Sequence, residues 1–238
     1  MKNNKKYFPL LPHGRMKQIL PNIYTVTGTM RLFGIFQYSR CMTIIKNGNE
    51  LSLLNPVRVD ESLLSEIENL GEIKYLIKLG QLHSVDLPFY MDRFSPKLWA
   101  NREDPNVSAY NPEGYFDDNE DLTFLDAKVK VIEASKVKEA VLVSRDEGGC
   151  LHSCDAFVNM GTDPNHNWLT AKLSKFLPTP TYIGPNWIKV AKPPKTSIEA
   201  ALQYDFENFI PAHGEPLLGG AKQTLTAYME SYDKQWAK

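Results

Sequence analysis

The chain has 238 residues, with 27 Lys and Arg, 28 Asp and Glu, and 42% hydrophobic residues. This length and composition suit one large or two small globular domains, and they exclude a disulfide-stapled scaffold and a disordered chain. The net charge is −1, and the only basic block is the short Lys2–Lys6 cluster. Because nucleic-acid binding depends on a strong positive field, we expect no nucleic-acid partner.

The cysteine content and the apolar pattern indicate a cytoplasmic protein. Three cysteines are an odd, small number for this length, which suits a reducing compartment. The stretch Tyr7–Pro12 after the basic start is too short and too rich in proline for a signal peptide. No window reaches about 18 uninterrupted apolar residues, so we expect no membrane partner.

The N-terminal half predicts a β-meander. Residues 1–20 contain two prolines and a basic start, and we expect a loosely held arm there, followed by a single domain over residues 21–238. The Asn47-Gly48 pair predicts a hairpin turn. Short β-branched and aromatic runs predict four strands on either side of it: Ile23–Gly28, Gly34–Tyr38, Cys41–Ile45 and Leu51–Leu54.

After Pro56 the pattern changes to alternating helices and strands. Apolar residues at helical spacing predict a helix over Glu61–Leu70, which Gly71 ends. The next elements we expect are a strand Lys74–Leu79, a helix Val85–Phe94 and a strand Lys97–Ala100.

The C-terminal half repeats strands followed by helices, with two long stretches that lack periodicity. The expected elements are strands Val129–Ile132, Glu139–Ser144, Gly149–Val158 and Asn208–Pro211, and helices Ser197–Tyr204 and Lys222–Trp236. Two sets of strands and helices predict an α/β fold in which two mixed sheets pack together with helices outside, a four-layer αββα sandwich. We expect the irregular stretches 101–121 and 161–195 to cover a pocket mouth as lids. The alternative is that Tyr110, Tyr115 and Phe116 are packed parts of the core.

Three segments place polar side chains directly after an apolar strand, where α/β sheets carry their sites. These segments are Gln81–Asp86, Cys150–Phe157 and Pro211–Pro216. Their order and spacing carry more information than any one of them alone.

On these segments the chain resembles the metallo-β-lactamase fold superfamily, in a branch with a degenerate metal motif. The similarity runs from Ile19 to Tyr228 and includes Asn22–Val26, Met42–Ile45, Leu53–Pro56 and the late His213-Gly214. The resemblance implies the same αββα fold and a metal site between the sheets.

The superfamily motif H-x-H-x-D-H matches this chain at one of four positions. Gln81, His83, Val85 and Asp86 stand at those positions, and no histidine lies between His83 and His152. The resemblance matches Asp155 to the bridging aspartate and His213 to the last histidine. It therefore implies a first metal site reduced to His83, and a second site formed by Asp86, Asp155 and His213.

This ligand set implies at most one divalent metal ion, Zn²⁺, Mn²⁺ or Fe²⁺, or none, and no dinuclear centre. The resemblance then implies a hydrolase-like protein acting on an ester, thioester or lactone-type bond of a small-molecule substrate. His83 and Asp155 are the catalytic candidates. The alternative is an inactive protein that binds a small molecule or a partner in the old pocket, and redox chemistry at a non-haem iron is a third possibility. The sequence predicts neither the substrate nor the oligomeric state.

Other roles for the same residues stay open. His83 and Asp86 suit the start of a helix, where they would hydrogen-bond free N–H groups, and Asp155 suits the organisation of a loop. We expect His83, Asp155 and His213 to lie within about 10 Å of one another if they line one pocket. Cys150, His152 and Cys154 share one face of a strand, which indicates buried core residues more than a zinc site. His13 and His166 lie in polar, proline-containing stretches typical of a surface.

Overall fold

The computed structural model describes residues 7–32, 35–116, 120–160, 167–170, 172 and 182–236. The strands of its first sheet lie side by side in chain order, β1-β2-β3-β4-β5-β6-β7. Neighbours from β1 to β4 are antiparallel, and those from β4 to β7 are parallel. The strands are β1 (Lys17–Leu20), β2 (Ile23–Leu32), β3 (Phe36–Asn47), β4 (Glu50–Leu54), β5 (Glu72–Lys78), β6 (Lys97–Ala100) and β7 (Gly114–Tyr115).

The second sheet has the order β12-β11-β10-β9-β8. Only the β11–β12 pair is parallel, so both sheets are mixed, as predicted. Its strands are β8 (Glu120–Leu122), β9 (Ala127–Val131), β10 (Ala140–Ser144), β11 (Cys150–Ser153) and β12 (Asn208–Pro211).

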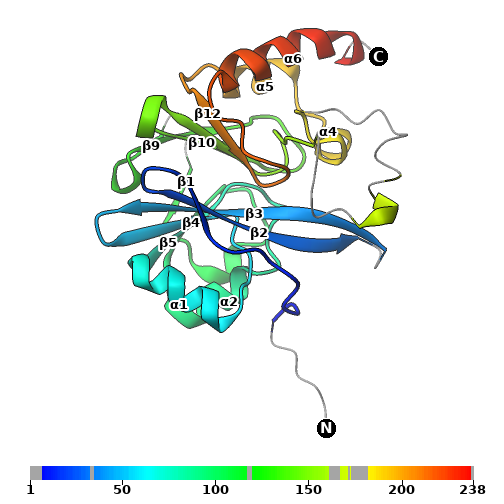
Figure 1. The fold of residues 1–238 in the computed structure, drawn as a ribbon. Helices are drawn as coiled ribbons and strands as arrows, with labels where there is room; N and C mark the ends of the chain where they lie inside the picture. The colour runs from blue at the N-terminus through cyan, green and yellow to red at the C-terminus, as the bar shows by residue number, and fades with distance from the viewer. Residues whose placement is uncertain are drawn as a thin grey trace.

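Helices cover the outer face of each sheet, which confirms the predicted αββα sandwich (Figure 1). α1 (Glu61–Leu70) and α2 (Leu87–Phe94) lie below the first sheet in this view. α4 (Pro185–Ala191), α5 (Lys195–Ala201) and α6 (Ala221–Trp236) lie on the second. Three 3₁₀ turns complete the described elements: Ser108–Tyr110, Thr123–Leu125 and Asp146–Gly148.

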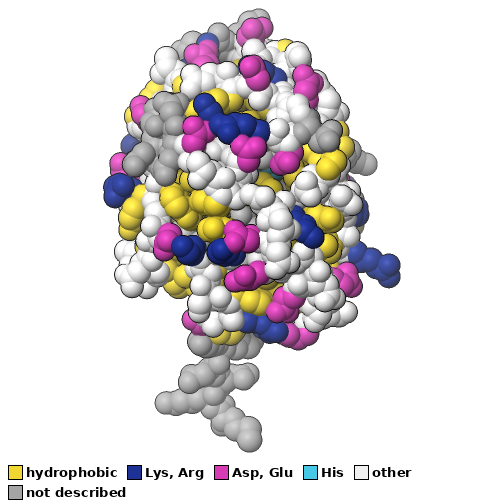
Figure 2. All heavy atoms as spheres, turned by 90° about the vertical axis from the view of Figure 1, so that its left-hand side faces the viewer, with side chains coloured by type: hydrophobic (Ala, Val, Ile, Leu, Met, Phe, Trp, Pro, Cys, Tyr) yellow, Lys and Arg dark blue, Asp and Glu magenta, His cyan; other side chains and the backbone are white. Residues whose placement is uncertain are grey.

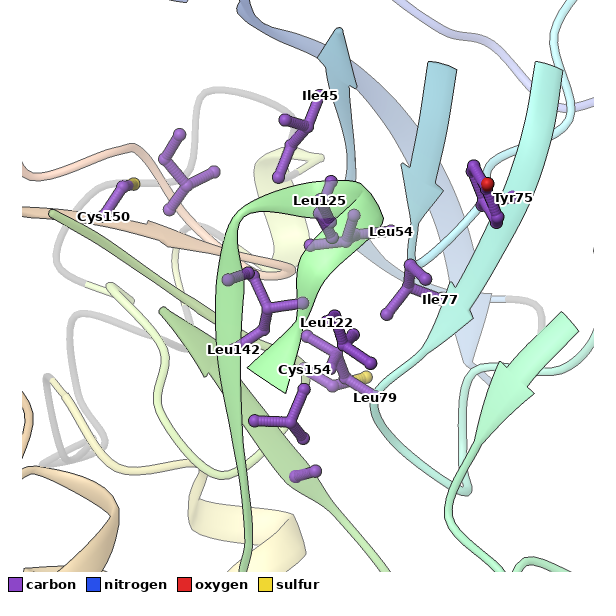
Figure 3. Close-up of a cluster of buried hydrophobic side chains, with 14 of the residues drawn as sticks. Ile45, Leu54, Tyr75, Ile77, Leu79, Leu122, Leu125, Leu142, Cys150 and Cys154 are labelled. Atoms are coloured by element: carbon purple, nitrogen blue, oxygen red, sulfur yellow. The ribbon is translucent and has the colours of Figure 1, made fainter. Parts of the chain in front are cut away.

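Three hydrophobic clusters hold the four layers together. The cluster between the sheets includes Leu54 and Ile77 from one sheet and Leu142 from the other (Figure 3). A second cluster joins the first sheet to α1 and α2, and a third joins the second sheet to α4, α5 and α6. Burial at about 25 cal/mol per Å² of apolar surface makes these clusters the main stabilising contribution.

Where the sequence signal is strongest, the predicted ends of helices and strands agree with the structure. α1, β6 and β12 coincide with the predicted ranges, and Gly48 takes a φ of 59° in the predicted hairpin turn. The two strands predicted over 34–45 form one long strand, β3, whose residues 36–45 pair with the whole of β2. The predicted strand Gly149–Val158 is shorter, since β11 ends at Ser153.

Part of the expected N-terminal arm is attached to the first sheet. β1 pairs with β2, and the Thr29 backbone N–H donates to the Pro12 carbonyl at 3.1 Å. The loosely held character expected for residues 1–20 therefore does not extend to residues 12–20.

The described part of 101–121 is built into the fold, in contrast to the expected lid. Asp104 forms a buried ion pair with Lys78, Val107 belongs to the cluster under the first sheet, and Phe116 belongs to the cluster between the sheets. The alternative reading of a packed segment is therefore correct for Phe116. Of the second expected lid, residues 161–166, 171 and 173–181 lie outside the described residues.

The surface of the described residues carries charges of both signs. On the face shown in Figure 2, basic and acidic side chains are interspersed and form no broad patch of one sign. Among the described helices, none is long and apolar enough to span a membrane.

Candidate metal site

The site lies where β5, β11 and β12 end. His83 follows β5 by five residues, Asp155 follows β11 by two, and His213 follows β12 by two. The His83 and His213 Nε2 atoms are 3.0 Å apart. From His213 Nε2 to Asp155 Oδ1 the distance is 3.2 Å, and from His83 Nε2 to Asp155 Oδ2 it is 3.6 Å. The prediction that these three side chains meet in one place is confirmed.

The ring of His213 is oriented by the backbone of β3. Its Nδ1 lies 2.7 Å from the Ser39 carbonyl oxygen, so Nδ1 carries the proton and donates it there. The neighbouring Cys41 N–H donates to the Ala212 carbonyl at 2.7 Å and fixes the segment before the histidine. This arrangement directs the Nε2 atom toward His83 and Asp155, where it would serve as a metal ligand in the neutral form of the ring.

Electrostatics favour a negative Asp155 beside a positive His213. Burial works against the ionisation of Asp155, but the two histidines outweigh it and hold its pKa well below the usual range. Burial also favours a neutral His213, yet the hydrogen bond and the charge of Asp155 raise its pKa above 6.5. For His83 burial prevails and lowers the pKa. The group thus offers one ionised carboxylate, that of Asp155, and two imidazole nitrogens. The His83 imidazole readily takes the neutral form in which it can bind a metal ion.

Cys154 is a fourth metal-competent side chain that sequence reasoning did not place in the site. Ligand atoms of His83, Cys154 and Asp155 all lie within 4.8 Å of one another. The thiol donates to Asp155 Oδ2 at 3.5 Å. The signal in the sequence is its position directly before Asp155, which a reading of Cys150, His152 and Cys154 as one strand face obscures.

The buried carboxylate of Glu139 fixes the loop that carries Asp155. Glu139 precedes β10 and is fully buried. It accepts hydrogen bonds from the backbone N–H groups of Cys154 and Ala156 at 3.0 and 2.7 Å, from that of Asp155 at 3.0 Å, and from Ser153 Oγ at 3.1 Å. Burial, together with the charge of Asp155, raises its pKa to about 8. Nothing local in the sequence signals this role, because the donors lie 14 to 17 residues away.

Gln81, at the first position of the metal motif, has a structural role. Its side-chain oxygen accepts a hydrogen bond from the Lys138 N–H at 3.0 Å, and its own N–H donates to the Lys138 carbonyl at 2.9 Å. The Gln81 side chain is thus engaged with the Lys138 backbone, while His83 lies with Asp155 and His213 and not in a separate first site.

A buried lysine anchors the loop that carries His83. Lys78 Nζ donates to the Gly80 carbonyl at 2.6 Å and to the Gln81 carbonyl at 3.3 Å, and it forms an ion pair with Asp104. Both side chains of the pair are 1% exposed. The loop that carries His83 is thereby fixed to the segment that follows β6.

Asp86, the third expected ligand, is paired with a cation. Its Oδ2 accepts a hydrogen bond from Arg40 Nη2 at 2.7 Å, and both side chains are buried. The helix-capping alternative does not apply either, because the Asp86 side chain makes no cap hydrogen bond to α2. The sequence offers no signal for Arg40, which comes from β3, 46 residues earlier.

The remaining candidates lie apart from the site. Cys150 is buried between the sheets, and His152 Nε2 lies 3.1 Å from Ser144 Oγ. His13, expected at the surface, accepts a hydrogen bond from the Asp60 N–H, and its side chain is 11% exposed. His166 lies outside the described residues.

The residues present fit a single divalent ion. Donors bound to zinc at 2.0–2.1 Å in tetrahedral geometry stand about 3.3 Å apart. The three distances among His83, His213 and Asp155, 3.0 to 3.6 Å, lie close to that separation. Two histidines and one carboxylate also form a familiar donor set for Zn²⁺ and Fe²⁺.

Comparison with known proteins identifies the fold. No protein-family model and no curated protein matches the chain. The structure is similar to the metallo-β-lactamase FIM-1 from Pseudomonas aeruginosa in its mono-zinc form, with a TM-score of 0.61 and 12% identity over 94% of this chain and 98% of that one. For the metallo-β-lactamase from Hirschia baltica the TM-score is 0.57, with 12% identity over 90% and 96% of the two chains.

The chain is also similar to part of a longer protein. The flavodiiron core of Flv1 from Synechocystis sp. PCC6803 matches with a TM-score of 0.67 and 11% identity, over 96% of this chain and 63% of that one. The chain therefore has the metallo-β-lactamase fold. Within that fold it carries a possible metal-binding group, His83, Cys154 and Asp155.

Proposed function

We propose that the protein is a hydrolase-like protein with one divalent metal ion, held by His83, Asp155 and His213, that acts on an ester, thioester or lactone-type bond of a small molecule. The observation that carries this proposal is the convergence of the two Nε2 atoms and the Asp155 carboxylate at 3.0 to 3.6 Å. Asp86, which the sequence placed in this set, is left out because Arg40 neutralises it.

The chain supplies the features that such a site requires. A divalent ion bound there would lower the pKa of a coordinated water and polarise a carbonyl oxygen. Three protein donors leave a coordination position for that water. The side chains of Asp155 and His213 are 17% and 15% exposed, so one side of the site is open to solvent. His213 would hold the ion through a deprotonated Nε2, and because Asp155 raises the His213 pKa, metal affinity would weaken as the pH falls.

A hollow elsewhere on the described surface has the size for a small molecule, and none of His83, Asp155 and His213 lines it. Its volume is about 340 Å³, and the residues that line it include Asn101, Phe116, Ile132 and Lys138. Lys138 pairs through its backbone with Gln81, two residues before His83. Small-molecule pockets typically measure about 300 Å³ or more, so this hollow could hold a small molecule, but it does not itself connect that molecule to the metal site.

The test is hydrolysis by the metal-loaded protein. We expect protein loaded with Zn²⁺, Mn²⁺ or Fe²⁺ to cleave at least one of an aryl ester, an acyl thioester and an acyl lactone. Asp155→Asn should reduce the rate by about 100-fold or more, in the range typical of lost catalytic groups. Asp205→Asn is the matched control, since that carboxylate is fully exposed on the surface.

A metal-free binding protein is the second candidate. It is favoured by the direct contact of the two Nε2 atoms, since a neutral and a protonated ring can share a hydrogen bond without any ion. If no metal-loaded form cleaves any of the three substrates above the rate of Asp155→Asn, the hydrolase proposal is wrong. Isothermal titration with the uncleaved substrates then measures the binding function directly.

A further inference from the structure

We propose that the hollow at the ends of β6, β7 and β9 is a second ligand site, which binds a small zwitterion, an α-amino acid with an apolar side chain. The proposal does not depend on the metal site, because none of His83, Asp155 and His213 lines this hollow. The volume of the hollow, about 340 Å³, suits a small molecule.

The first support is the position of the hollow in the fold. Three of its lining residues directly follow a strand: Asn101 follows β6, Phe116 follows β7, and Ile132 follows β9. β6 and β7 are parallel, so their carboxyl ends lie at one edge of the first sheet. Ligands of α/β proteins commonly bind beyond the carboxyl ends of strands. The hollow therefore lies where the fold leaves side chains available to a ligand.

The second support is a preformed apolar wall. The Phe116 N–H donates to the Ala100 carbonyl at 3.0 Å, and the Ile132 N–H donates to the Glu139 carbonyl at 2.9 Å. Ser135 Oγ donates to the Ile132 carbonyl at 2.9 Å and fixes the turn that follows β9. The side chains of Phe116 and Ile132 are buried and line the hollow. Because these side chains are already held in place, an apolar ligand group can pack on them without a further ordering cost.

The third support is a buried amide that has a donor to spare. Asn101 is 5% exposed and lines the hollow. Its Oδ1 accepts a hydrogen bond from the Glu103 N–H at 2.9 Å. Its Nδ2 has no hydrogen-bond partner among the described residues. A buried donor without a partner costs stability, and a ligand carboxylate would supply the missing acceptor.

The fourth support is the balance of charge around the hollow. Two basic and two acidic side chains line it: Arg102, Lys138, Glu103 and Glu133. Lys138 forms an ion pair with Glu103. In the part of the chain that the structure describes, the Glu133 carboxylate has no ion-pair or hydrogen-bond partner, so it is available to an ammonium group. A lone anion would be repelled by Glu133, and a lone cation by Lys138, whereas a zwitterion pairs with both.

The test is isothermal titration of the full chain with L-leucine, and with L-phenylalanine as a second apolar amino acid. We expect one molecule of either amino acid to bind per chain. 4-Methylpentanoate lacks the ammonium group of leucine, and 3-methylbutylamine lacks its carboxylate. Each analogue leaves one charged group of the hollow unpaired, so each should bind at least about tenfold more weakly than leucine. If neither amino acid binds, the proposal is wrong.

Two variants locate the binding in the hollow. Glu133→Gln should weaken leucine binding by about tenfold and bind 4-methylpentanoate more tightly than the parent does, because the carboxylate that repels this anion is gone. Asn101→Asp keeps the acceptor for the Glu103 N–H and replaces the Nδ2 donor by an oxygen that repels the ligand carboxylate, so leucine binding should be lost. If circular dichroism shows that Asn101→Asp is unfolded, Glu133→Gln decides, since Glu133 is exposed. Glu66→Gln on the exposed face of α1 is the matched control and should bind leucine as the parent does.

Asp155→Asn separates this site from the metal site, because a free amino acid can also bind to a metal ion. This variant should bind leucine as tightly as the parent. Leucine binding that is lost in Asp155→Asn and unchanged in Glu133→Gln would overturn the second ligand site and leave the proposed metal site standing. Equal leucine affinity in the parent, Glu133→Gln and a folded Asn101→Asp would overturn it as well.

Discussion

Glu139 connects the loop of Asp155 to the second sheet through four hydrogen bonds, three of them from backbone N–H groups. Such outer contacts orient the ligands of a metal site, and their loss commonly costs 10- to 100-fold in affinity. In this chain the backbone N–H groups of Cys154 and Asp155 both donate to the Glu139 carboxylate, so one residue fixes the backbone that carries both side chains.

Glu139→Gln should weaken both the fold and the metal site. The amide has one acceptor oxygen, so at least one buried N–H loses its partner at a cost of about 1–3 kcal/mol in the free energy of unfolding. We expect Zn²⁺ affinity to fall by about 10- to 100-fold. Urea denaturation and Zn²⁺ titration measure the two effects, and Glu66→Gln on the exposed face of α1 is the control. Equal Zn²⁺ affinity in both variants would show that Glu139 does not position the ligands.

His152 makes the stability depend on acid pH. Burial lowers its pKa to about 3 in the folded protein, against 6.5 in the unfolded chain. The unfolded state therefore binds more protons below pH 6.5, so the stability contribution is present above pH 6.5 and is lost as the pH falls toward 3, by about 1.4 kcal/mol per pH unit.

The check is a series of urea denaturations between pH 7 and pH 4. His152→Leu should be less stable at pH 7, since Ser144 Oγ loses its partner, but its stability should fall less steeply with acid. Parallel slopes for the parent and the variant would contradict the assignment.

At the scale of single residues, the sequence predicts those site residues that have a metal-binding side chain and follow directly after a strand. His83, Asp155 and His213 are found because each follows a strand that ends at the same edge of the sandwich. Glu139 and Arg40 are not, because their roles depend on contacts between segments distant in the chain. Cys154 stands next to Asp155, but its alternation with Cys150 and His152 favours a core strand.

At the scale of elements, the buried Arg40–Asp86 ion pair joins β3 to the start of α2. Arg40 Nε and Asp86 Oδ1 lack hydrogen-bond partners among the described residues, so the pair is incompletely compensated for its loss of hydration. Burying ions costs several kcal/mol each, and the attraction between them repays this only in part.

Removing one charge of this pair should therefore lower the free energy of unfolding more than removing both. Arg40→Met leaves Asp86 buried without a counter-charge and should lower the free energy of unfolding by about 3–5 kcal/mol. The double variant Arg40→Met, Asp86→Leu should recover most of that loss. Urea denaturation of the three proteins measures the coupling, and a double variant less stable than Arg40→Met would contradict this account.

The elements that sequence patterns predict well are those with a complete local signal. α1 has an N-cap aspartate, Asp60, whose side chain accepts from the Leu63 N–H, and a terminal Gly71. β7 has two residues, which is too short for any alternation to show. α4 starts at Pro185 within a proline-rich stretch, where single residues do not reveal a helix.

At the scale of the whole molecule, the segment 101–116 belongs to the core clusters. Deleting residues 106–118 removes Val107 from the cluster under the first sheet and Phe116 from the cluster between the sheets. Large buried side chains cost about 2–5 kcal/mol each when truncated, so we expect the deletion variant to be unfolded or to melt far below the parent. Far-ultraviolet circular dichroism during heating measures this. A melting temperature close to that of the parent would restore the interpretation of this segment as a lid.

The central claim is a single metal ion held by His83, Asp155 and His213, and metal content tests it most directly. After incubation with Zn²⁺ and exhaustive dialysis, mass spectrometry should find one equivalent per chain, and His213→Ala should retain less than one tenth of that. His13→Ala, which removes a histidine at a distance from the site, should retain the full equivalent. Two equivalents in the parent, or none, would contradict the account.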